Sequence, residues 1–466
     1  MTAASLRESI RAADWVRRTG RVTRFVGLTV ESQGPAAQLG EMCEIYSRAR
    51  GSATPAEVVG FAEGRLLLMP YEDLFGVEAG SEVIATGQSA EVHVGPQLLG
   101  RVIDAFGQPL DRKPLRVTDA RYPLYPSPIN PLDRGMLDEI LETGIRAVDS
   151  LLTLARGQRV GIFAGSGVGK STVLSMIARQ VKADVSVIAL VGERGREVKS
   201  FVENGLSEAA RGRSVVVAAT SDQPPLVRRR AAFLATAIAE YFRDQGLHVS
   251  LTMDSVTRVA MAQREIGLAS GELPTARGYT PSVFALLPRL LERGGARAAG
   301  GSLTALYTVL VEGDDFNDPI SDTVRSILDG HIVLTRAIAH RGRYPAIDAT
   351  QSISRLASAV VPEAEGRLVA DAIKLLAVYE SSRDLIEVGA YRAGTDATVD
   401  RAIKLVPEIE RFMAQKPDEV EVRAAAIERL RKLLQTPIAH AEPPAHSLRS
   451  APRATQAAAT VERRPS

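Results

Sequence analysis

The stretch from residue 160 to residue 178 constrains the fold of this chain more than any other. It contains an apolar run at 160–164, the glycine-rich segment Gly165-Ser166-Gly167-Val168-Gly169-Lys170-Ser171, and a helical pattern at 173–178. A strand, a loop of small residues and a helix N-terminus in this order turn successive backbone N–H groups toward a phosphate. Ala164 replaces the glycine that usually opens such a loop, and its small side chain is tolerated there. The stretch therefore predicts a P-loop.

The side chains of this loop point to a nucleoside triphosphate with a metal ion. Lys170 supplies a positive charge for the β and γ phosphates, and the hydroxyl of Ser171 can ligate Mg²⁺. We expect the nucleotide to contact the loop and the first residues of the following helix, namely Ala164, Gly165, Ser166, Gly167, Val168, Gly169, Lys170, Ser171 and Thr172.

A P-loop binds a nucleotide, but cleavage needs two further carboxylates. Asp254 follows the apolar run 249–253 and is the predicted acid on the metal side, acting through water, although a strand-capping role is the alternative. Glu193 follows the run 185–191 and is the predicted general base or water-orienting acid. Both would project beyond the C-terminal ends of parallel strands, where open α/β sheets bind ligands. Arg194 and Glu197 either orient Glu193 or form a solvated ion pair.

Three patterns of apolar residues predict the fold class. Residues 21–95 contain short alternating runs with turn residues roughly every ten positions, which predicts a small β-barrel. Later runs rich in Val, Ile and Leu alternate with helical patterns, which is typical of an α/β core with a mainly parallel sheet buried on both faces. Apolar residues at helical spacing then predict a helical C-terminal domain. The expected division is an amphipathic helix at 1–20, the barrel at 21–95, the P-loop core at 96–365, the helical domain at 366–436 and a disordered tail at 437–466.

Composition excludes several classes of protein. The 57 Lys and Arg residues nearly balance the 55 Asp and Glu residues, so no overall charge favours a nucleic acid as partner. Cys43 is the only cysteine, which excludes an intrachain disulfide and a thiolate metal cluster. Charge-free apolar stretches such as 231–239 are too short to span a bilayer, and charges at Arg7 and Glu8 argue against a signal peptide. We expect a cytoplasmic protein.

Three motifs together resemble one known family. The P-loop at 164–171, the run Gly192-Glu-Arg-Gly-Arg-Glu and the run Pro345-Ala-Ile-Asp-Ala-Thr-Gln-Ser-Ile-Ser354 are similar to those of rotary ATP synthase α/β subunits and type III secretion ATPases. Residues 261–266, 271–281 and 389–396 resemble the flagellum-specific branch of that family. The resemblance covers about residues 20–436 and implies a RecA-like P-loop core. It also implies Mg²⁺-dependent ATP hydrolysis that energises flagellar type III protein export, by releasing and unfolding substrates and their chaperones at the export gate.

The resemblance carries roles onto individual residues. Lys170 and Ser171 would hold the phosphates and Mg²⁺, and Asp254 would be the acid on the metal side. Glu193 would be the general base or water-orienting acid, a carboxylate that relatives without turnover lack. Arg355 would be an arginine finger given to the nucleotide of the neighbouring subunit, unless it forms a surface ion pair or folds close to the P-loop of its own chain. Tyr344 would pack on the adenine, unless it belongs to the core.

The same resemblance implies the partners. It predicts a homohexamer with its sites at subunit interfaces, a regulatory or stator-like export component bound by the N-terminal helix, and a central stalk facing the loop 266–279. Trp15 lies in that helix, which could instead pack on its own chain. Export substrates, chaperones and the export gate complete the partners, and peripheral association with the inner membrane at the flagellar base would come through them.

Other functions stay open at this point. An injectisome ATPase and a catalytic subunit of a rotary synthase share the chemistry. A ring RNA helicase uses a related core, but the near-neutral charge and the scattered aromatic residues disfavour it. A nucleotide-gated scaffold, in which turnover is incidental, is the non-enzymatic alternative.

Overall fold

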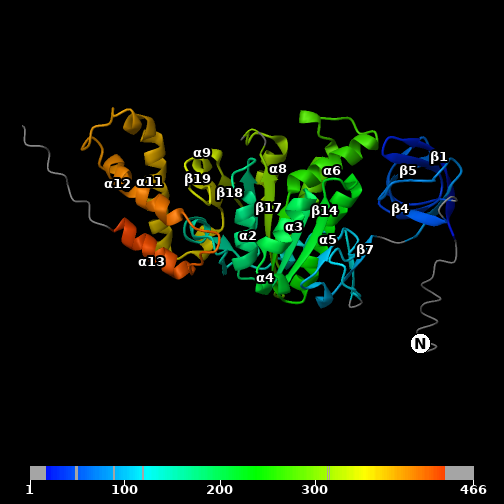
Figure 1. Ribbon diagram of the computed structural model, residues 1–466, viewed down its shortest axis with the longest axis horizontal. Coiled ribbons are helices and arrows are strands. Elements are labelled where there is room, and N and C mark those ends of the chain that lie inside the picture. The colour runs from blue at the N-terminus through cyan, green and yellow to red at the C-terminus, as the bar shows by residue number, and fades with distance from the viewer. Residues whose placement is uncertain are drawn as a thin grey trace, which may run out of the picture.

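The computed structural model describes residues 17–47, 51–87, 90–117, 120–311, 313 and 315–435. A barrel, a sheet core and a helical part follow one another along the long axis of the molecule (Figure 1). Most of the helix predicted at 1–20, including Trp15, and the tail predicted at 437–466 lie outside the described residues. Thr19 and Gly20, at the end of that predicted helix, form the start of a strand instead.

The N-terminal part is a closed barrel. Val22, Val30, Ile45, Val58 and Leu68 come from different strands and fill its interior, because alternate residues of a strand point to the same face. The strand order is β1-β2-β5-β4-β3-β6, which confirms the predicted barrel. Its strands are β1 (Thr19–Val26), β2 (Thr29–Gln33), β3 (Met42–Ser47), β4 (Ser52–Ala62), β5 (Arg65–Pro70) and β6 (Glu82–Ala85). An antiparallel pair, β7 (Glu91–Val94) with β9 (Ala120–Pro123), follows the barrel.

The core is a sheet in the order β19-β18-β12-β17-β15-β13-β14-β8, with β16 added beside β17. The strands are β8 (Val102–Ile103), β12 (Arg159–Ala164), β13 (Val185–Glu193), β14 (Ser214–Thr220), β15 (His248–Asp254), β16 (Gly295–Ala296), β17 (Ser302–Leu310), β18 (Gly330–Leu334) and β19 (Ile347–Ser354). Pairing is parallel except at β16 and β19, which confirms the predicted mainly parallel sheet. The motif Pro345–Ser354 therefore lies mostly on an antiparallel edge strand.

Helices cover both faces of this sheet. Phe163 and Ile162 are neighbours on β12, yet they belong to different apolar clusters, as expected for a strand buried on both sides. One face packs against α5 (Pro225–Asp244), α6 (Val256–Ala269), α7 (Pro281–Leu291) and α8 (Pro319–Ile327). The other packs against α2 (Lys170–Gln180) and α4 (Glu208–Gly212). Short elements complete the core: α3 (Gly195–Ser200), α9 (Arg336–His340), α10 (Ala357–Val360), β10 (Ile140–Leu141) and β11 (Leu154–Ala155).

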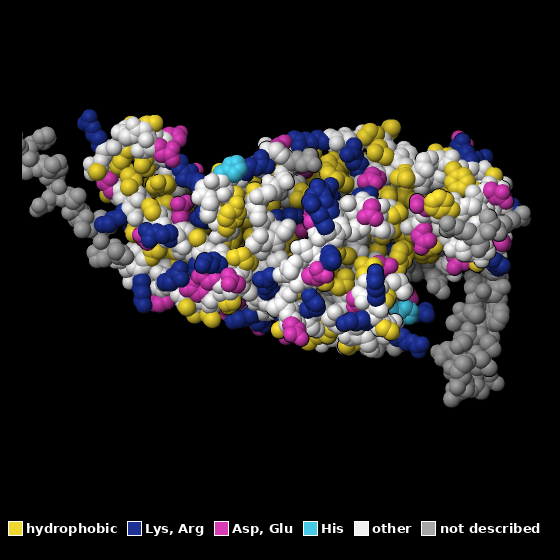
Figure 2. Space-filling view, in the orientation of Figure 1, with side chains coloured by type: hydrophobic (Ala, Val, Ile, Leu, Met, Phe, Trp, Pro, Cys, Tyr) yellow, Lys and Arg dark blue, Asp and Glu magenta, His cyan; other side chains and the backbone are white. Residues whose placement is uncertain are grey.

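The C-terminal part consists of α11 (Glu363–Glu387), α12 (Ala397–Met413) and α13 (Arg423–Leu434). Its buried residues Leu405, Ile409 and Leu430 share one apolar cluster with α2 and β12, so this part packs on the side of the core that carries the P-loop helix. The predicted helical C-terminal domain is confirmed. On the face shown in Figure 2, the basic and acidic side chains of the described residues are interspersed rather than gathered into one basic stripe.

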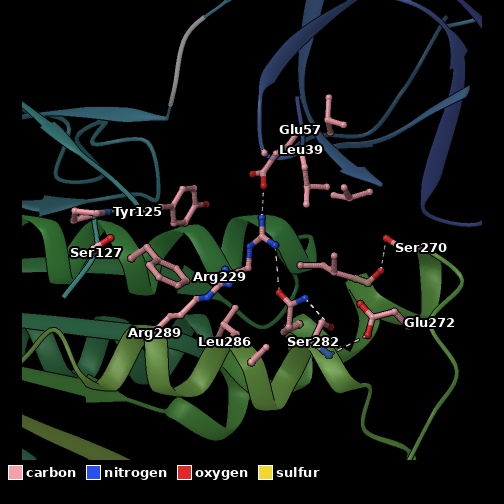
Figure 3. A pocket seen from close by; sticks show the side chains of 18 of the residues that line it. Leu39, Glu57, Tyr125, Ser127, Arg229, Ser270, Glu272, Ser282, Leu286 and Arg289 are labelled. Atoms are coloured by element: carbon pink, nitrogen blue, oxygen red, sulfur yellow. Dashed lines mark hydrogen bonds and ion pairs between the residues drawn. The ribbon is translucent and has the colours of Figure 1, made fainter. Parts of the chain in front are cut away.

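A cavity of about 640 Å³ separates the barrel from α5, α6 and α7 (Figure 3). A buried ion pair between Arg229 of α5 and Glu57 of β4 crosses it, and the Tyr71 hydroxyl also donates to Glu57, at 2.5 Å. From Arg229 a guanidinium N–H donates to Gln263 of α6 at 3.2 Å, and the Gln263 amide donates to the Ser282 hydroxyl of α7 at 3.0 Å. This chain of polar contacts fixes the barrel against the core.

We predict that Arg229→Ala lowers the melting temperature markedly. Removing one partner of a buried ion pair leaves the other charge uncompensated, which costs about 3–5 kcal/mol. The matched control is Arg289→Ala, because Arg289 lines the same cavity but is solvent-exposed (Figure 3). Thermal unfolding of the two variants checks this, and equal melting temperatures would show that the Arg229 pair does not stabilise the junction.

Candidate functional site

The predicted P-loop joins β12 to α2. Ala164 is fully buried and pairs with Leu310 of β17 and Leu334 of β18, so the loop begins from the middle of the sheet. Gly167 and Gly169 have φ values of +80° and +87°, a backbone conformation that other residues avoid. Val168 is buried and anchors the loop, whereas Ser166, Gly167, Ser171 and Thr172 are exposed. The start of α2 therefore presents its free backbone N–H groups to solvent, as an anion site requires.

The two predicted carboxylates stand at the ends of neighbouring strands. Glu193 is the last residue of β13 and Asp254 the last residue of β15. Lys170 Nζ forms an ion pair with Asp254 Oδ1 and lies 3.5 Å from Glu193 Oε1. The structure thus brings together three residues that the sequence analysis placed in one site.

The three charged side chains of this cluster are largely buried, which affects their protonation. The side chains of Lys170, Glu193 and Asp254 are only 12%, 16% and 7% exposed. Burial and the negative charge of Asp254 raise the pKa of Glu193 to about 7, while Lys170 acts in the opposite direction. A hydrogen bond with the Glu197 carboxyl raises the pKa of Glu193 further. Glu193 is therefore poised to change protonation near neutral pH.

Arg194 and Glu197 were expected either to orient Glu193 or to form an ion pair, and contacts of both kinds are present. Arg194 donates to Glu197 Oε1 at 3.1 Å in an exposed ion pair. Glu197 is also hydrogen-bonded to Glu193. Glu197 thus links the exposed ion pair to Glu193, the predicted general base or water-orienting acid.

Tyr344 lies beside the P-loop and is not a core residue. Its ring is so close to Gly169 that a Cβ built on that glycine would lie 3.4 Å from the ring. The side chain is 47% exposed, so nearly half of its surface is open to solvent beside the loop.

Arg355 and the P-loop of its own chain lie at opposite ends of the parallel strands. It follows Ser354, which pairs with Gly330 of β18, and Gly330 pairs with Val160 near the start of β12. The P-loop leaves β12 four residues later, and at about 3.3 Å per residue this puts about 13 Å of strand between the two ends. The Arg355 side chain is exposed. Folding therefore does not bring Arg355 to the P-loop in cis.

The donor set suits Mg²⁺ delivered with a nucleotide. Among the described residues, no group of three or more His, Cys, Asp and Glu side chains is arranged to hold a metal alone. Mg²⁺ is commonly bound by one or two protein oxygens together with substrate phosphates and water. The exposed Ser171 hydroxyl at the start of α2 and the Asp254 carboxylate beside Lys170 are oxygen donors of that kind.

Two residues of the site were missed by the sequence analysis. The Thr308 hydroxyl of β17 donates to Asp254 Oδ1 at 2.7 Å, and a polar residue inside the apolar run 306–311 was the available sign. Arg258 of α6 packs against Gly192, where an added Cβ would lie 2.8 Å from the Arg258 Cβ, and its Nε is buried without a hydrogen-bond partner. No spacing in the sequence identifies Arg258.

Family models match three consecutive parts of the chain. They are the β-barrel domain of the ATP synthase alpha/beta family at residues 22–87, the nucleotide-binding domain of that family at 144–354, and the T3SS EscN ATPase C-terminal domain at 361–432. None of the described helices has the length and hydropathy needed to cross a membrane.

Named relatives and solved structures agree with these models. The chain is 52% identical to a flagellum-specific ATP synthase of Bacillus subtilis over 93% of this chain and 99% of the relative. It is 48% identical to a type 3 secretion system ATPase of Xanthomonas euvesicatoria, over 89% and 93%. The structure of the assembled ATPase EscN from the type III secretion system of enteropathogenic E. coli has 45% identity, covers 89% of this chain and all of the EscN chain, and superposes with a TM-score of 0.85. EscN has also been solved in complex with its central stalk EscO, with a TM-score of 0.82.

These likenesses span nearly the whole described chain and confirm the predicted fold class and the prediction of an ATPase that energises type III protein export. The model that matches the C-terminal part describes the T3SS EscN ATPase. The chain therefore belongs to the ATP synthase alpha/beta family, in the branch formed by flagellum-specific and type III secretion ATPases.

Proposed function

We propose that this chain hydrolyses ATP at the P-loop through Lys170, Glu193 and Asp254, in a site that a second copy completes with Arg355. The observation that carries the proposal is the position of Lys170 Nζ between Asp254 and Glu193 at the C-terminal edge of the sheet. An ammonium held there can meet the β and γ phosphates, and a carboxylate on either side can manage the metal and the water.

The residues divide the chemistry among them. The backbone N–H groups of residues 164–171 and the Lys170 ammonium bind the phosphates. Ionised Glu193 accepts a hydrogen bond from the attacking water, orients it in line with the γ phosphate and takes its proton. Ser171 and, through water, Asp254 would hold Mg²⁺, which neutralises charge that develops on the phosphates. The products are ADP and inorganic phosphate.

The pKa of Glu193 predicts how the rate of ATP hydrolysis depends on pH. Its pKa of about 7 means that it is protonated, and unable to accept a proton, below neutral pH. We expect kcat/KM for ATP to fall about tenfold per pH unit below about pH 7 and to level off above it, because kcat/KM reports groups of the free enzyme. The measurement is initial phosphate release between pH 5.5 and 9.

The control variant for this profile is Glu197→Gln. Removing the Glu197 carboxyl removes a contact that raises the pKa of Glu193, so the midpoint moves to lower pH. Titration of ATP itself is common to both profiles and cancels in the comparison. Identical midpoints for the two proteins would show that Glu193 does not govern the profile.

Arg355 supports a ring in which each site is shared. Its exposed side chain stands away from its own P-loop, so it can serve a nucleotide only on a neighbouring copy. We propose a homohexamer, the closed ring implied by the family resemblance. The relative EscN has been solved in an assembled form.

Mixing two inactive variants tests the shared site. Glu193→Gln retains nucleotide binding and loses about 10²- to 10⁴-fold in turnover, and Arg355→Ala loses about a thousandfold. In random mixed rings about one interface in four combines intact Glu193 with intact Arg355, so activity returns on mixing. Phosphate release from one-to-one mixtures is compared with that of each variant alone. Mixtures no more active than their components would contradict the shared site.

The proposal also extends to the export system that this chain serves and to its partner proteins. The flagellar relatives support flagellar export, and the injectisome remains the alternative that the type 3 secretion relatives support. We propose that the loop 266–279 contacts a central stalk, since Leu273 is 82% exposed and Arg277 is tied to Asp315 at 2.6 Å, which steadies the loop. The stator-like component, the export gate, the substrates and their chaperones would place the chain in the cytoplasm at the inner membrane.

A further inference from the structure

The segment between α12 and α13 connects the helical part of the chain to the wall of the nucleotide pocket. Gln415, two residues after α12 ends, is 5% exposed although it lies outside regular secondary structure. A buried glutamine requires hydrogen-bond partners for its amide, because an unsatisfied buried polar group is costly. The partners of Gln415 show what this segment holds in place.

The hydrogen bonds of Gln415 connect its own segment to residues near the P-loop. Its side-chain oxygen accepts a hydrogen bond from the Arg146 backbone N–H at 2.7 Å, and its side-chain nitrogen donates to the Gly144 carbonyl and the Glu419 carbonyl, both at 2.8 Å. Its backbone N–H donates to the carbonyl of Tyr344 at 2.9 Å. Gln415 therefore joins the loop at 144–146, which follows β10, to the residue that lies beside Gly169.

Arg146 also holds the segment around Gln415 in place. This arginine is almost fully buried, and its guanidinium donates to the carbonyls of Phe412 and Ala414 at 2.9 and 2.7 Å. It also forms ion pairs with Glu419 and Glu421. Both sides of Gln415 are thus held by charge-assisted hydrogen bonds, which are stronger than neutral ones.

The loop that receives Gln415 is itself packed on the P-loop helix. A Cβ on Gly144 would lie 2.3 Å from the Gln180 Cβ at the end of α2, so only glycine allows this approach. The Gln180 amide donates to the Glu419 carbonyl at 3.3 Å. The P-loop helix, the loop at 144–146 and the segment around Gln415 form one packed unit, with the Tyr344 carbonyl attached to it.

We propose that Gln415 is a positioning residue for nucleotide binding, which acts by holding Tyr344 against the P-loop. The inference rests on the proposed packing of Tyr344 on the adenine. Gln415 does not touch the reacting atoms, which lie with Lys170 and Glu193. Its contact with Tyr344 is made by the backbone N–H, so a substitution acts by removing the side-chain hydrogen bonds that hold this segment in place. Loss of these bonds weakens contact with the base and leaves the chemical step intact.

The variants are Gln415→Ala, Gln415→Glu, Tyr344→Ala and the double variant Tyr344→Ala with Gln415→Ala. Gln415→Glu keeps the size of the side chain but places a carboxylate oxygen against the carbonyls of Gly144 and Glu419. Gln245→Ala is the matched control, because Gln245 is exposed at the end of α5. KM and kcat for ATP, the affinity for ADP by calorimetry and the melting temperature are measured for each.

Stacking of an aromatic ring on a base contributes enough that Tyr344→Ala should raise KM for ATP and weaken ADP binding about tenfold or more. Gln415→Ala and Gln415→Glu should do the same by up to about that factor, with kcat within about twofold of the parent. In the Tyr344→Ala background, Gln415→Ala should add less than about twofold, since residues that act as a unit are not additive. Gln245→Ala should match the parent.

Four results would overturn the inference. An equal rise in KM in both backgrounds means that Gln415 acts independently of Tyr344. A loss in kcat with unchanged KM, or a fall in melting temperature without any change in affinity, means a general structural role. If Tyr344→Ala leaves KM and ADP affinity unchanged while ATP is still hydrolysed, the proposed adenine contact fails first and the role of Gln415 fails with it.

Discussion

One buried ammonium between two carboxylates is the interaction on which the rest of this structure depends. Lys170 begins the helix after β12, Asp254 ends β15 and Glu193 ends β13, so three separate strand ends must meet within a few ångströms. The intervening strand β17 contributes Thr308 to hold Asp254. Because a buried charge without a partner is costly, a shift that separated these three groups would destabilise the fold. The parallel sheet is the frame that keeps the three groups in register.

The sequence predicted the parts of the site that rest on local pattern. The P-loop could be found because glycine positions and a strand-loop-helix order determine its backbone, and Glu193 and Asp254 because each follows an apolar strand. The edge strand β19 could not be predicted, because its exposed polar residues do not form an apolar pattern. Thr350 and Gln351, for example, form hydrogen bonds with Asp348. Arg258 and Gln415 depend on contacts between segments far apart in the chain, for which periodicity carries no information.

The barrel and the helical part stand at opposite ends of the core and are attached to it by different means (Figure 1). The barrel meets the core across a cavity spanned by the Arg229–Glu57 ion pair, and Met69 of β5 also lies in the apolar cluster of the core. The helical part shares an apolar cluster with α2 and contacts Tyr344 through Gln415. A movement of the helical part would therefore reach the nucleotide pocket directly.

The position of Arg355 implies that a single chain and an assembly differ in activity. The pocket of one chain contains the phosphate-binding loop and both acids, whereas Arg355, which follows β19, lies at the other end of the strands. The most direct measurement is phosphate release per chain with Mg²⁺ and ATP over a wide range of protein concentration, with the mass of the particles determined in the same samples. Our account predicts almost no release from single chains and a rise that follows assembly. Release that is equally fast from isolated chains, or absent even from assembled ones, would contradict it.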